Sequence, residues 1–344
     1  MKKTIFALFA LSILTVTLIA LISRRGLENR VAVAPNGREI PDWGPLDPHL
    51  GRDLVEKLGY EASWINLDTL PKRHAYWKRF TNFILNKNHA KAVVFHNYHP
   101  FFSKAKIDQL PKGNRILVMW EPPSVLLDMY QDEVLSLFDK VYTWNDDLVD
   151  GKKYFKMNYG VLRPMRANLP SFQERKLLCM IASNYKFNNF EEELYSTRQE
   201  LARYFDQHPE GVFDLYGRRW EGFRHAKGTI PDKLETLKGY KFNICFENTK
   251  QPGYITEKIF DCFVTGTIPI YYGATNVNQY IPKGCYIDYR QFKNEGEMLS
   301  YIQKLTKEEY EEYIANIRAY LKSEQAKQFA PEHFAKTLID AIEN

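Results

Sequence analysis

The sequence has few cysteines, and they show no pattern. Its 344 residues include four cysteines, which stand far apart at positions 179, 245, 262 and 285. This spacing excludes a small disulfide-stabilised domain and a zinc site built on paired cysteines. No Asn-x-Ser/Thr sequence occurs, so the chain offers no acceptor site for N-glycosylation. Together these absences favour the cytosol as the compartment of the folded part.

Long runs of one charge are also lacking. The 47 Lys and Arg residues are mixed with 42 Asp and Glu residues, which leaves a net charge of +5 at pH 7. A nucleic-acid partner is therefore not predicted, and a phosphate-bearing small molecule suits this charge equally well. With 44% hydrophobic residues, the chain is long enough for two domains that each bury a core.

One long apolar run does occur, near the amino terminus. Residues 4–22 (TIFALFALSILTVTLIALI) carry no charge and, as an α-helix, would nearly span the core of a bilayer. A cleaved signal peptide is the alternative, because Lys2 and Lys3 precede the run. No small-x-small cleavage site follows it directly. We therefore predict an uncleaved membrane anchor in residues 1–23 and a stalk in residues 24–50.

The rest of the sequence alternates short apolar runs with longer amphipathic stretches. This alternation is typical of α/β domains, and a segment rich in proline and polar residues separates two such series. We predict two α/β domains, residues 51–165 and residues 175–344, facing each other across a cleft. The predicted strands are 92–95, 115–120, 141–144, 176–183, 212–217, 242–246 and 268–272, and the predicted helices are about 190–208, about 255–265 and parts of 306–344.

Polar groups are concentrated after the predicted strand FNICF. Thr256 is predicted to cap a helix whose first turn contains Glu257 and Lys258, where unpaired backbone N–H groups favour an anion. A phosphate would offset the unfavourable position of a lysine at this end of a helix dipole. Glu257 could accept hydrogen bonds from sugar hydroxyls, and Asn248 and Tyr254 add polar contacts. These groups suit a nucleotide-sugar; a solvated loop and helix start is the alternative interpretation.

The run FENTKQPGYITEKIFDCFVTGTIPIYYG closely resembles the donor-binding signature of the α-1,3/α-1,4-fucosyltransferases of glycosyltransferase family 10. The resemblance implies a GT-B fold, made of two Rossmann-like domains, whose carboxyl-terminal domain holds guanosine diphosphate fucose. It further implies that Asn248, Tyr254, Glu257 and Lys258 contact the donor. Lys258 would bind phosphate, and Glu257 would bind sugar hydroxyls.

Two other segments extend the resemblance over roughly residues 90–290. The segment at 182–205 is similar to the stretch of the family that ends in a helical arginine on the pyrophosphate, which would be Arg198. The segment MWEPPSV is similar to the segment with the family's proposed catalytic base, which would be Glu121. Here proline follows the glutamate where serine is usual. A surface glutamate ahead of a turn is the alternative interpretation of Glu121.

An inverting sugar transfer needs one base to take the proton of the acceptor hydroxyl while the nucleoside diphosphate leaves. Glu121 is the predicted base, and Arg198 and Lys258 are predicted to neutralise the diphosphate. Because the sequence contains no Asp-x-Asp metal motif, we predict turnover without a metal or other cofactor. His96 and His99 have a spacing that could suit a metal but lack acidic or cysteine neighbours, so the acceptor cleft is their predicted place.

The resemblance implies an α-(1,3)-fucosyltransferase whose partners are GDP-fucose and a glycan containing N-acetylglucosamine. Residues 4–22 add the membrane as a partner. We predict a bacterial inner-membrane protein with a cytosolic catalytic domain, and a Golgi type II membrane protein is the alternative. Two other functions stay open. One is a different inverting GT-B nucleotide-sugar transferase, and the other is a membrane-tethered glycan-binding protein without turnover.

Overall fold

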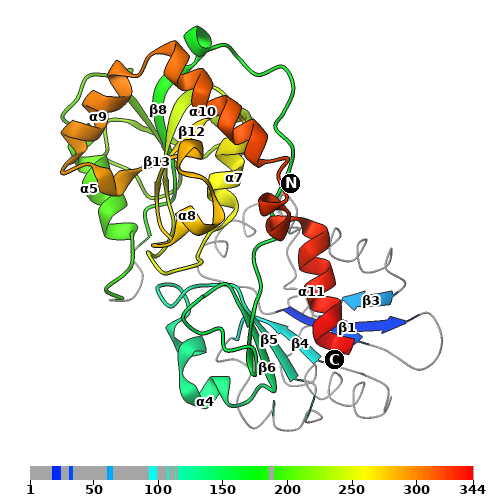
Figure 1. Cartoon of the computed structure of the whole chain (residues 1–344). Coiled ribbons are helices and arrows are strands. Elements are labelled where there is room, and N and C mark those ends of the chain that lie inside the picture. Colours follow the sequence, from blue (N-terminus) through cyan, green and yellow to red (C-terminus); the bar gives the residue numbers. More distant parts are fainter. Residues whose placement is uncertain are drawn as a thin grey trace, which may run out of the picture. The chain divides into compact units, whose positions relative to one another are not determined.

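A computed structural model describes residues 18–24, 31–33, 60–64, 93–98, 107, 113, 115–185 and 190–343. These residues form two compact units, which Figure 1 traces along the chain. The first unit contains the described residues up to 143 together with 148–156 and 335–343. The second unit contains residues 144–147 and 157–334. Each unit is built on one sheet, as expected for an α/β protein.

The sheet of the first unit has the strand order β2-β3-β1-β4-β5-β6-β7 within the described residues. Strands β4 to β7 run parallel to one another, whereas β1 is antiparallel to β2, β3 and β4. The bounds are β1 (Leu18–Arg24), β2 (Val31–Val33), β3 (Tyr60–Trp64), β4 (Val93–His96), β5 (Arg115–Met119), β6 (Lys140–Thr143) and β7 (Tyr154–Lys156). The three strands predicted for the first domain are confirmed, with shifts of one residue at their ends.

The amino terminus differs from the sequence-based prediction of an anchor helix. Residues 18–22, the end of the predicted anchor, lie in β1, which pairs with β3 on one side and with β4 on the other. Strand β2, within the predicted stalk, belongs to the same sheet. A continuous apolar run is typical of an inner strand as well as of a membrane helix, so the pattern alone does not separate the two. Residues 4–17 lie outside the described residues.

Among the residues that the structure describes, no helix is both long and apolar enough to cross a membrane.

The sheet of the second unit is parallel throughout, in the order β10-β9-β8-β11-β12-β13. Its strands are β8 (Lys176–Ile181), β9 (Phe213–Tyr216), β10 (Ala226–Gly228), β11 (Tyr240–Phe246), β12 (Ile268–Tyr272) and β13 (Ile287–Asp288). Counted from β8 as the first strand, this is the Rossmann order 3-2-1-4-5-6. The strand order reverses between β8 and β11, and in open sheets of this kind ligands bind beyond the carboxyl ends of the strands at that point.

Helices cover both faces of the second sheet, with α7 and α10 on one side and α5 and α9 on the other (Figure 1). The two predicted helices in this region are confirmed as α5 and α7, with narrower bounds. The helices of the described residues are α4 (Asp132–Leu135), α5 (Tyr195–Phe205), α6 (Lys233–Leu237), α7 (Glu257–Val264), α8 (Val277–Tyr280), α9 (Glu295–Lys304), α10 (Lys307–Tyr320) and α11 (Pro331–Glu343). Short 3-10 helices are η2 (Leu127–Tyr130), η3 (Phe172–Glu174), η4 (Lys283–Cys285), η5 (Tyr289–Gln291) and η6 (Gln325–Phe329).

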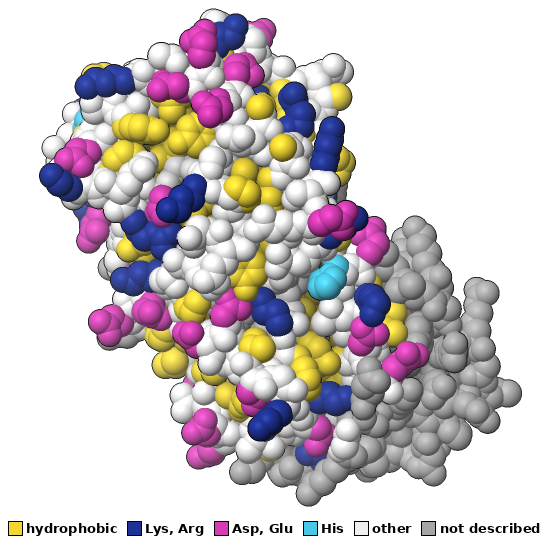
Figure 2. All heavy atoms as spheres, viewed as in Figure 1, with side chains coloured by type: hydrophobic (Ala, Val, Ile, Leu, Met, Phe, Trp, Pro, Cys, Tyr) yellow, Lys and Arg dark blue, Asp and Glu magenta, His cyan; other side chains and the backbone are white. Residues whose placement is uncertain are grey.

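The core of the second unit is aromatic and fixes α7 against the sheet. Phe260 and Phe263 of α7 are completely buried, and so is Phe242 of β11. Burying a large apolar side chain contributes roughly 1.5–3 kcal/mol, so this helix is held mainly by packing. All four cysteines are buried and unpaired. On the face that Figure 2 shows, basic and acidic side chains are interspersed rather than gathered by sign.

Candidate functional site

The first turn of α7 lies at the carboxyl edge of the second sheet. Thr256 precedes α7 as its N-cap, and its Oγ1 accepts a hydrogen bond from the Lys258 backbone N–H at 3.4 Å. The predicted cap is therefore confirmed. Glu257 and Lys258 are the first two residues of the helix, as the sequence predicts. The segment from β11 to α7 thus brings a carboxylate, an ammonium group and a helix amino terminus to the switch point of the sheet.

Glu247, the residue directly after β11, is the centre of this arrangement. Its side chain is completely buried and accepts hydrogen bonds on both oxygens. Oε1 accepts from the backbone N–H and the hydroxyl of Thr256, both at 2.9 Å. Oε2 accepts from Lys258 Nζ at 2.9 Å and from the Thr256 hydroxyl at 2.8 Å. A buried carboxylate is stable when it is paired in this way, and it ties the strand end to the start of α7.

Gly273, which follows β12, leaves the space that the Glu247 side chain occupies. A Cβ atom added at Gly273 would lie 2.5 Å from Glu247 Cγ and 2.6 Å from the Tyr271 hydroxyl oxygen. Such distances are too short for any side chain without movement of buried neighbours. The glycine that ends the run IPIYYG is therefore explained by the close approach of the two strand ends.

Lys258 and Glu257 belong to a chain of alternating charges. Lys258 Nζ also donates to Thr256 Oγ1 at 2.9 Å, and its side chain is 23% exposed. Burial alone would lower the pKa of Lys258, but the charges of Glu247 and Glu257 outweigh burial and raise that pKa. For Glu257, burial opposes ionisation, but the charges of Lys258 and Lys233 lower the pKa of its carboxyl to about 2. Both side chains are therefore ionised at neutral pH.

Lys233, the first residue of α6, extends this chain away from the sheet. Its Nζ lies 3.8 Å from Glu257 Oε1 and 2.8 Å from Asp261 Oδ2. Asp261 lies one turn along α7 and also forms an ion pair with Arg163. Neither Lys233 nor Arg163 is among the residues predicted from the sequence. Their contacts fix the orientation of α7, because each joins a separate segment to its first turns.

Arg198 lies on α5, and its side chain reaches the carboxyl end of β11. Its Nη2 donates to the backbone carbonyls of Phe246 and Glu247, both at 2.6 Å, and to Asn248 Oδ1 at 3.1 Å. Only 5% of the residue is exposed. Its Nε and Nη1 make no hydrogen bond with any described residue, and neither atom is completely buried. Arg198 therefore positions the loop after β11 and retains N–H groups for a ligand.

Tyr254 is packed among aromatic rings. It is 2% exposed, and its ring centroid lies 4.5 Å from that of Trp144 and 6.1 Å from that of Tyr159. Its backbone carbonyl accepts a hydrogen bond from the Tyr271 hydroxyl at 3.2 Å. The structure thus gives Tyr254 a place in the core beneath the loop, whereas Glu257 and Lys258 are partly exposed.

Asp146 holds the loop that precedes Tyr254. Its carboxylate accepts hydrogen bonds from the Tyr280 hydroxyl at 2.7 Å and from Asn276 Nδ2 at 2.7 Å. Asn276 Oδ1 in turn accepts from the Gly253 backbone N–H at 2.8 Å. No local sequence pattern predicts this link, because Asp146 is more than 100 residues from its partners.

The predicted base, Glu121, lies at the carboxyl edge of the first sheet. The backbone N–H groups of Trp120 and Glu121 donate to Asn97 Oδ1 at 2.7 and 2.9 Å. The Glu121 carbonyl accepts from the Tyr130 hydroxyl at 2.8 Å. Asn97 is almost completely buried and has a φ of 61°, a conformation that asparagine tolerates better than most residues. Asn97 therefore positions the Glu121 turn, although it was not predicted as a site residue.

His96 is the last residue of β4 and lies beside the same turn. Its ring centroid is 5.0 Å from that of Trp120. The structure thus brings His96 and Glu121 to neighbouring strand ends, since β4 and β5 pair in parallel. His99 lies outside the described residues. Within the described parts of the chain, no group of three or more His, Cys, Asp or Glu side chains is arranged to hold a metal ion.

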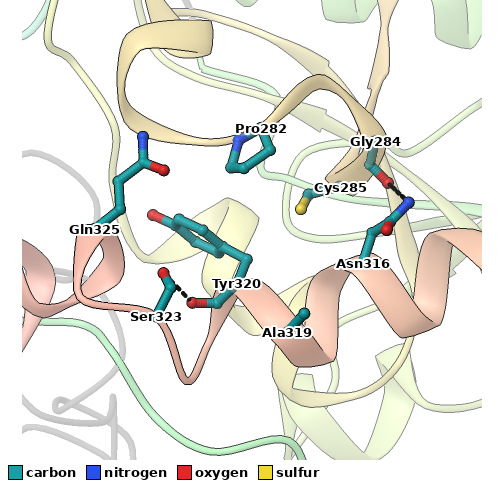
Figure 3. A pocket seen from close by; sticks show the side chains of 8 residues that line it. All are labelled: Pro282, Gly284, Cys285, Asn316, Ala319, Tyr320, Ser323 and Gln325. Atoms are coloured by element: carbon teal, nitrogen blue, oxygen red, sulfur yellow. Dashed lines mark hydrogen bonds between the residues drawn. The ribbon is translucent and has the colours of Figure 1, made fainter.

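A separate cavity of about 360 Å³ lies between the segment 282–285 and α10 (Figure 3). Its lining carries no charged side chain. Tyr320 lines it, but the Tyr320 hydroxyl oxygen is buried and has no hydrogen-bond partner among the described residues. Because that oxygen is inaccessible to water, a molecule in the cavity would not reach it. Its polar side chains, Asn316, Ser323 and Gln325, already donate to the backbone carbonyls of Gly284, Tyr320 and Gln279, so the cavity offers few polar groups to a ligand.

Comparison with known proteins connects the site at the second sheet with a family. Residues 172–340, which contain α5, β11, α7 and β12, match the model of the glycosyltransferase family 10 (fucosyltransferase) C-terminal region. Through these residues the chain belongs to glycosyltransferase family 10. The family predicted from the run 246–273 is thereby confirmed.

Similar curated proteins include fucosyltransferases of bacteria and mammals. The alpha-(1,3)-fucosyltransferase FucT of Helicobacter pylori is 43% identical over 76 residues, which are 22% of this chain and 16% of that protein. The 4-galactosyl-N-acetylglucosaminide 3-alpha-L-fucosyltransferase 9 of Mus musculus is 28% identical over 155 residues, which are 43% of this chain and 39% of that protein. The matches thus span well under half the length of these relatives.

One solved structure is similar in fold over a larger share of this chain than the two relatives above. An alpha-glucosyltransferase in complex with UDP and a 13-mer DNA aligns with a TM-score of 0.53 and 10% identity, over 82% of this chain and 85% of that one. At this identity the similarity concerns the fold alone. The similarity agrees with the predicted GT-B fold. In this chain the first sheet is mixed and the second sheet is parallel.

Proposed function

We propose that the chain transfers L-fucose from GDP-β-L-fucose to a hydroxyl of a glycan, namely O3 of N-acetylglucosamine, with inversion. The observation that carries the proposal is Glu247, which is buried at the switch point of the second sheet and holds Lys258 and the start of α7 beside Arg198. This arrangement lies within the residues that match the fucosyltransferase family model. Both relatives described above are named for transfer of fucose to a 3-position.

The donor side supplies positive groups for the leaving diphosphate. Lys258 uses two of its three N–H groups on Glu247 and Thr256, which leaves one for a phosphate oxygen. Arg198 adds a second cation, and the amino terminus of α7 adds backbone N–H groups and the positive end of the helix dipole. Fixed groups of this kind stabilise the charge that develops on the diphosphate as the sugar bond breaks. In this proposal turnover requires no metal.

Glu257 and Asn248 complete the donor side of the proposal. Glu257 is ionised and 26% exposed, so its carboxylate can accept hydrogen bonds from sugar hydroxyls. Asn248 is half-buried, and its Oδ1 is oriented by Arg198. The burial of Tyr254 favours a packing role under this loop over a large contact with the donor.

The proposed base is Glu121, which would take the proton of the acceptor hydroxyl as that oxygen attacks the anomeric carbon. Its main chain is fixed by Asn97 and Tyr130, which reduces the freedom of the carboxylate. His96 lies on the neighbouring strand end and is the candidate contact for the acceptor.

The proposal is tested with the purified full chain, GDP-fucose and N-acetyllactosamine in the presence of EDTA. We expect a mass gain of one deoxyhexose on the acceptor, and NMR of the product should show the new linkage at O3. GDP-mannose, which differs from GDP-fucose in the sugar alone, and UDP-galactose, which differs in both base and sugar, serve as comparison donors. If GDP-fucose binds but no sugar is transferred, either the proposed acceptor or the proposed base is wrong. If GDP-fucose does not bind, the proposed donor is wrong.

A further inference from the structure

A further arginine-containing turn lies at the carboxyl edge of the second sheet, after β9. It comprises Gly217, Arg218 and Arg219, and its main chain is held against the segment that follows β8. The Arg218 backbone N–H donates to Ser183 Oγ at 3.3 Å, and the Arg218 carbonyl accepts from the Asn184 backbone N–H at 2.9 Å. Asn184 also accepts from Gln199 on α5, the neighbour of Arg198, at 2.8 Å. The turn is therefore connected to the donor groups described above.

The backbone of this turn is unusual. Gly217 has a φ of 134°, and a Cβ atom added there would lie 2.0 Å from the Ala182 carbonyl oxygen. Arg219 has a φ of 64°, which few residues other than glycine adopt. Its guanidinium carbon lies 4.6 Å from the centroid of the Tyr185 ring. Glycine adopts a positive φ readily, so the strain in this turn lies at Arg219, and strained residues of this kind are concentrated at ligand sites.

Arg218 has no counter-charge among the described residues. It is half-buried, and its guanidinium forms neither a hydrogen bond nor an ion pair with any described residue. A guanidinium group carries five N–H donors in a planar fork. A group of this kind that is partly removed from water, at the edge where such sheets bind ligands, is suited to a ligand with two adjacent acceptors.

The spacing of the strands that precede Arg218 and Lys258 suits the length of a nucleotide. In sheets of this strand order, a bound nucleotide extends from the switch point toward the end of the second strand, which here is β9. Neighbouring strands are about 4.8 Å apart, so the ends of β11 and β9 are separated by roughly 10 Å. With the diphosphate at Lys258 and Arg198, the base would lie near the end of β9.

We propose that Arg218 recognises the O6 and N7 edge of guanine and thereby selects a guanosine diphosphate donor. The inference rests on the proposed function, because that function supplies guanine as the base. Guanine presents two acceptors, O6 and N7, at the spacing of an arginine fork, whereas adenine has a donor in place of O6. Uracil lacks N7 altogether. Arg218 would thus determine specificity for the base without contacting the reacting atoms.

The test is binding of four nucleotides to the full chain by calorimetry: GDP, inosine diphosphate, ADP and UDP. Inosine diphosphate keeps O6 and N7, so we expect the wild type to bind it about as well as GDP. The Arg218→Ala variant should lose about 5- to 150-fold in affinity for GDP and inosine diphosphate and little for ADP and UDP. Arg218→Lys should lose most of the same discrimination, because it keeps the charge but not the fork.

The matched control is Arg224→Ala, which removes an exposed arginine from the same loop and should leave all four affinities unchanged. An equal loss for all four nucleotides in Arg218→Ala would overturn the inference in favour of a phosphate contact. Unchanged GDP affinity would also overturn it. If the wild type binds none of the guanosine or inosine nucleotides, the proposed donor itself fails, and that outcome is distinct from a failure of Arg218 alone.

Discussion

Lys258 Nζ lies 2.9 Å from Oε2 of Glu247, a carboxylate with no exposed surface. The pair joins the end of β11 to the first turn of α7, so the lysine that is proposed to bind phosphate is held in place before any donor arrives. Lys258 also explains how a carboxylate can be buried at the centre of the site. Its ammonium group and the Thr256 N–H and hydroxyl together meet the hydrogen-bonding needs of Glu247.

Replacing Glu247 tests whether this pair is structural. Glu247→Gln should lower the free energy of unfolding by on the order of 3 kcal/mol, because a partly buried ammonium group loses its counter-charge. Donor affinity should fall as well, since the position of Lys258 is no longer fixed. Chemical denaturation measures the first effect. Glu235→Gln removes a surface carboxylate that also forms ion pairs and should unfold like the wild type.

Lys258→Ala should weaken GDP-fucose binding as well as turnover. Loss of a charge-assisted hydrogen bond to phosphate costs about 1.5–3 kcal/mol, or roughly a 10- to 150-fold increase in Kd. Calorimetry with GDP-fucose gives the value directly. Lys283→Ala, which removes an exposed lysine of the same unit, is the control. Wild-type affinity in Lys258→Ala would rule out the proposed phosphate contact.

Glu121→Gln should reduce transfer by a factor of about 10² to 10⁴ while GDP-fucose binding stays unchanged. The amide cannot take the proton of the acceptor hydroxyl, but no donor contact in the second unit is altered. Transfer rate and donor affinity are measured on the same preparation. Glu133→Gln, at an exposed position on α4, should behave as the wild type. If Glu121→Gln transfers fucose at the normal rate, another group is the base.

The charge chain around Glu257 should make stability depend on pH in the acid range. The pKa of Glu257 is about 2 in the folded chain, below the ordinary value of 4.5. The unfolded chain therefore binds the proton first, so the stabilisation is fully present above about pH 4.5 and is lost as the pH falls toward 2. The melting temperature of the wild type should fall more steeply over this range than that of Glu257→Gln. Parallel curves for the two proteins would contradict the pairing with Lys258 and Lys233.

Two tyrosines of α10 provide a matched test of hydrogen bonding in the core. The Tyr320 hydroxyl is buried with no partner among the described residues, whereas the Tyr310 hydroxyl donates to the Gly266 carbonyl at 2.6 Å. Tyr320→Phe should leave stability unchanged or raise it by about 1 kcal/mol. Tyr310→Phe should lower it by about the same amount. Denaturant titrations of both variants decide the point, and a strongly destabilised Tyr320→Phe would contradict the absence of a hydrogen-bond partner for this hydroxyl.

Local pattern was sufficient to predict the strands and helices that bear the donor groups. The run FNICF is apolar throughout because β11 is buried on both faces, and Thr256 directly after a polar loop is typical of a helix cap. The predicted membrane anchor, residues 4–22, differs from the structure at residues 18–22, which lie in strand β1. An apolar run has the same composition in an inner strand and in a membrane helix, and pairing with distant strands decides between them.

The sequence by itself determined the family, the alternation of strands and helices, and the place of Glu257 and Lys258 in one helical turn, because each depends on residues near one another in the chain. Tertiary structure alone decided that Glu247 is buried beneath Gly273, that Asn97 holds the turn of Glu121, and that Arg163 and Lys233 meet at Asp261. These contacts join segments far apart in sequence. Their partners are set by strand order and close packing, which no local spacing of residues encodes.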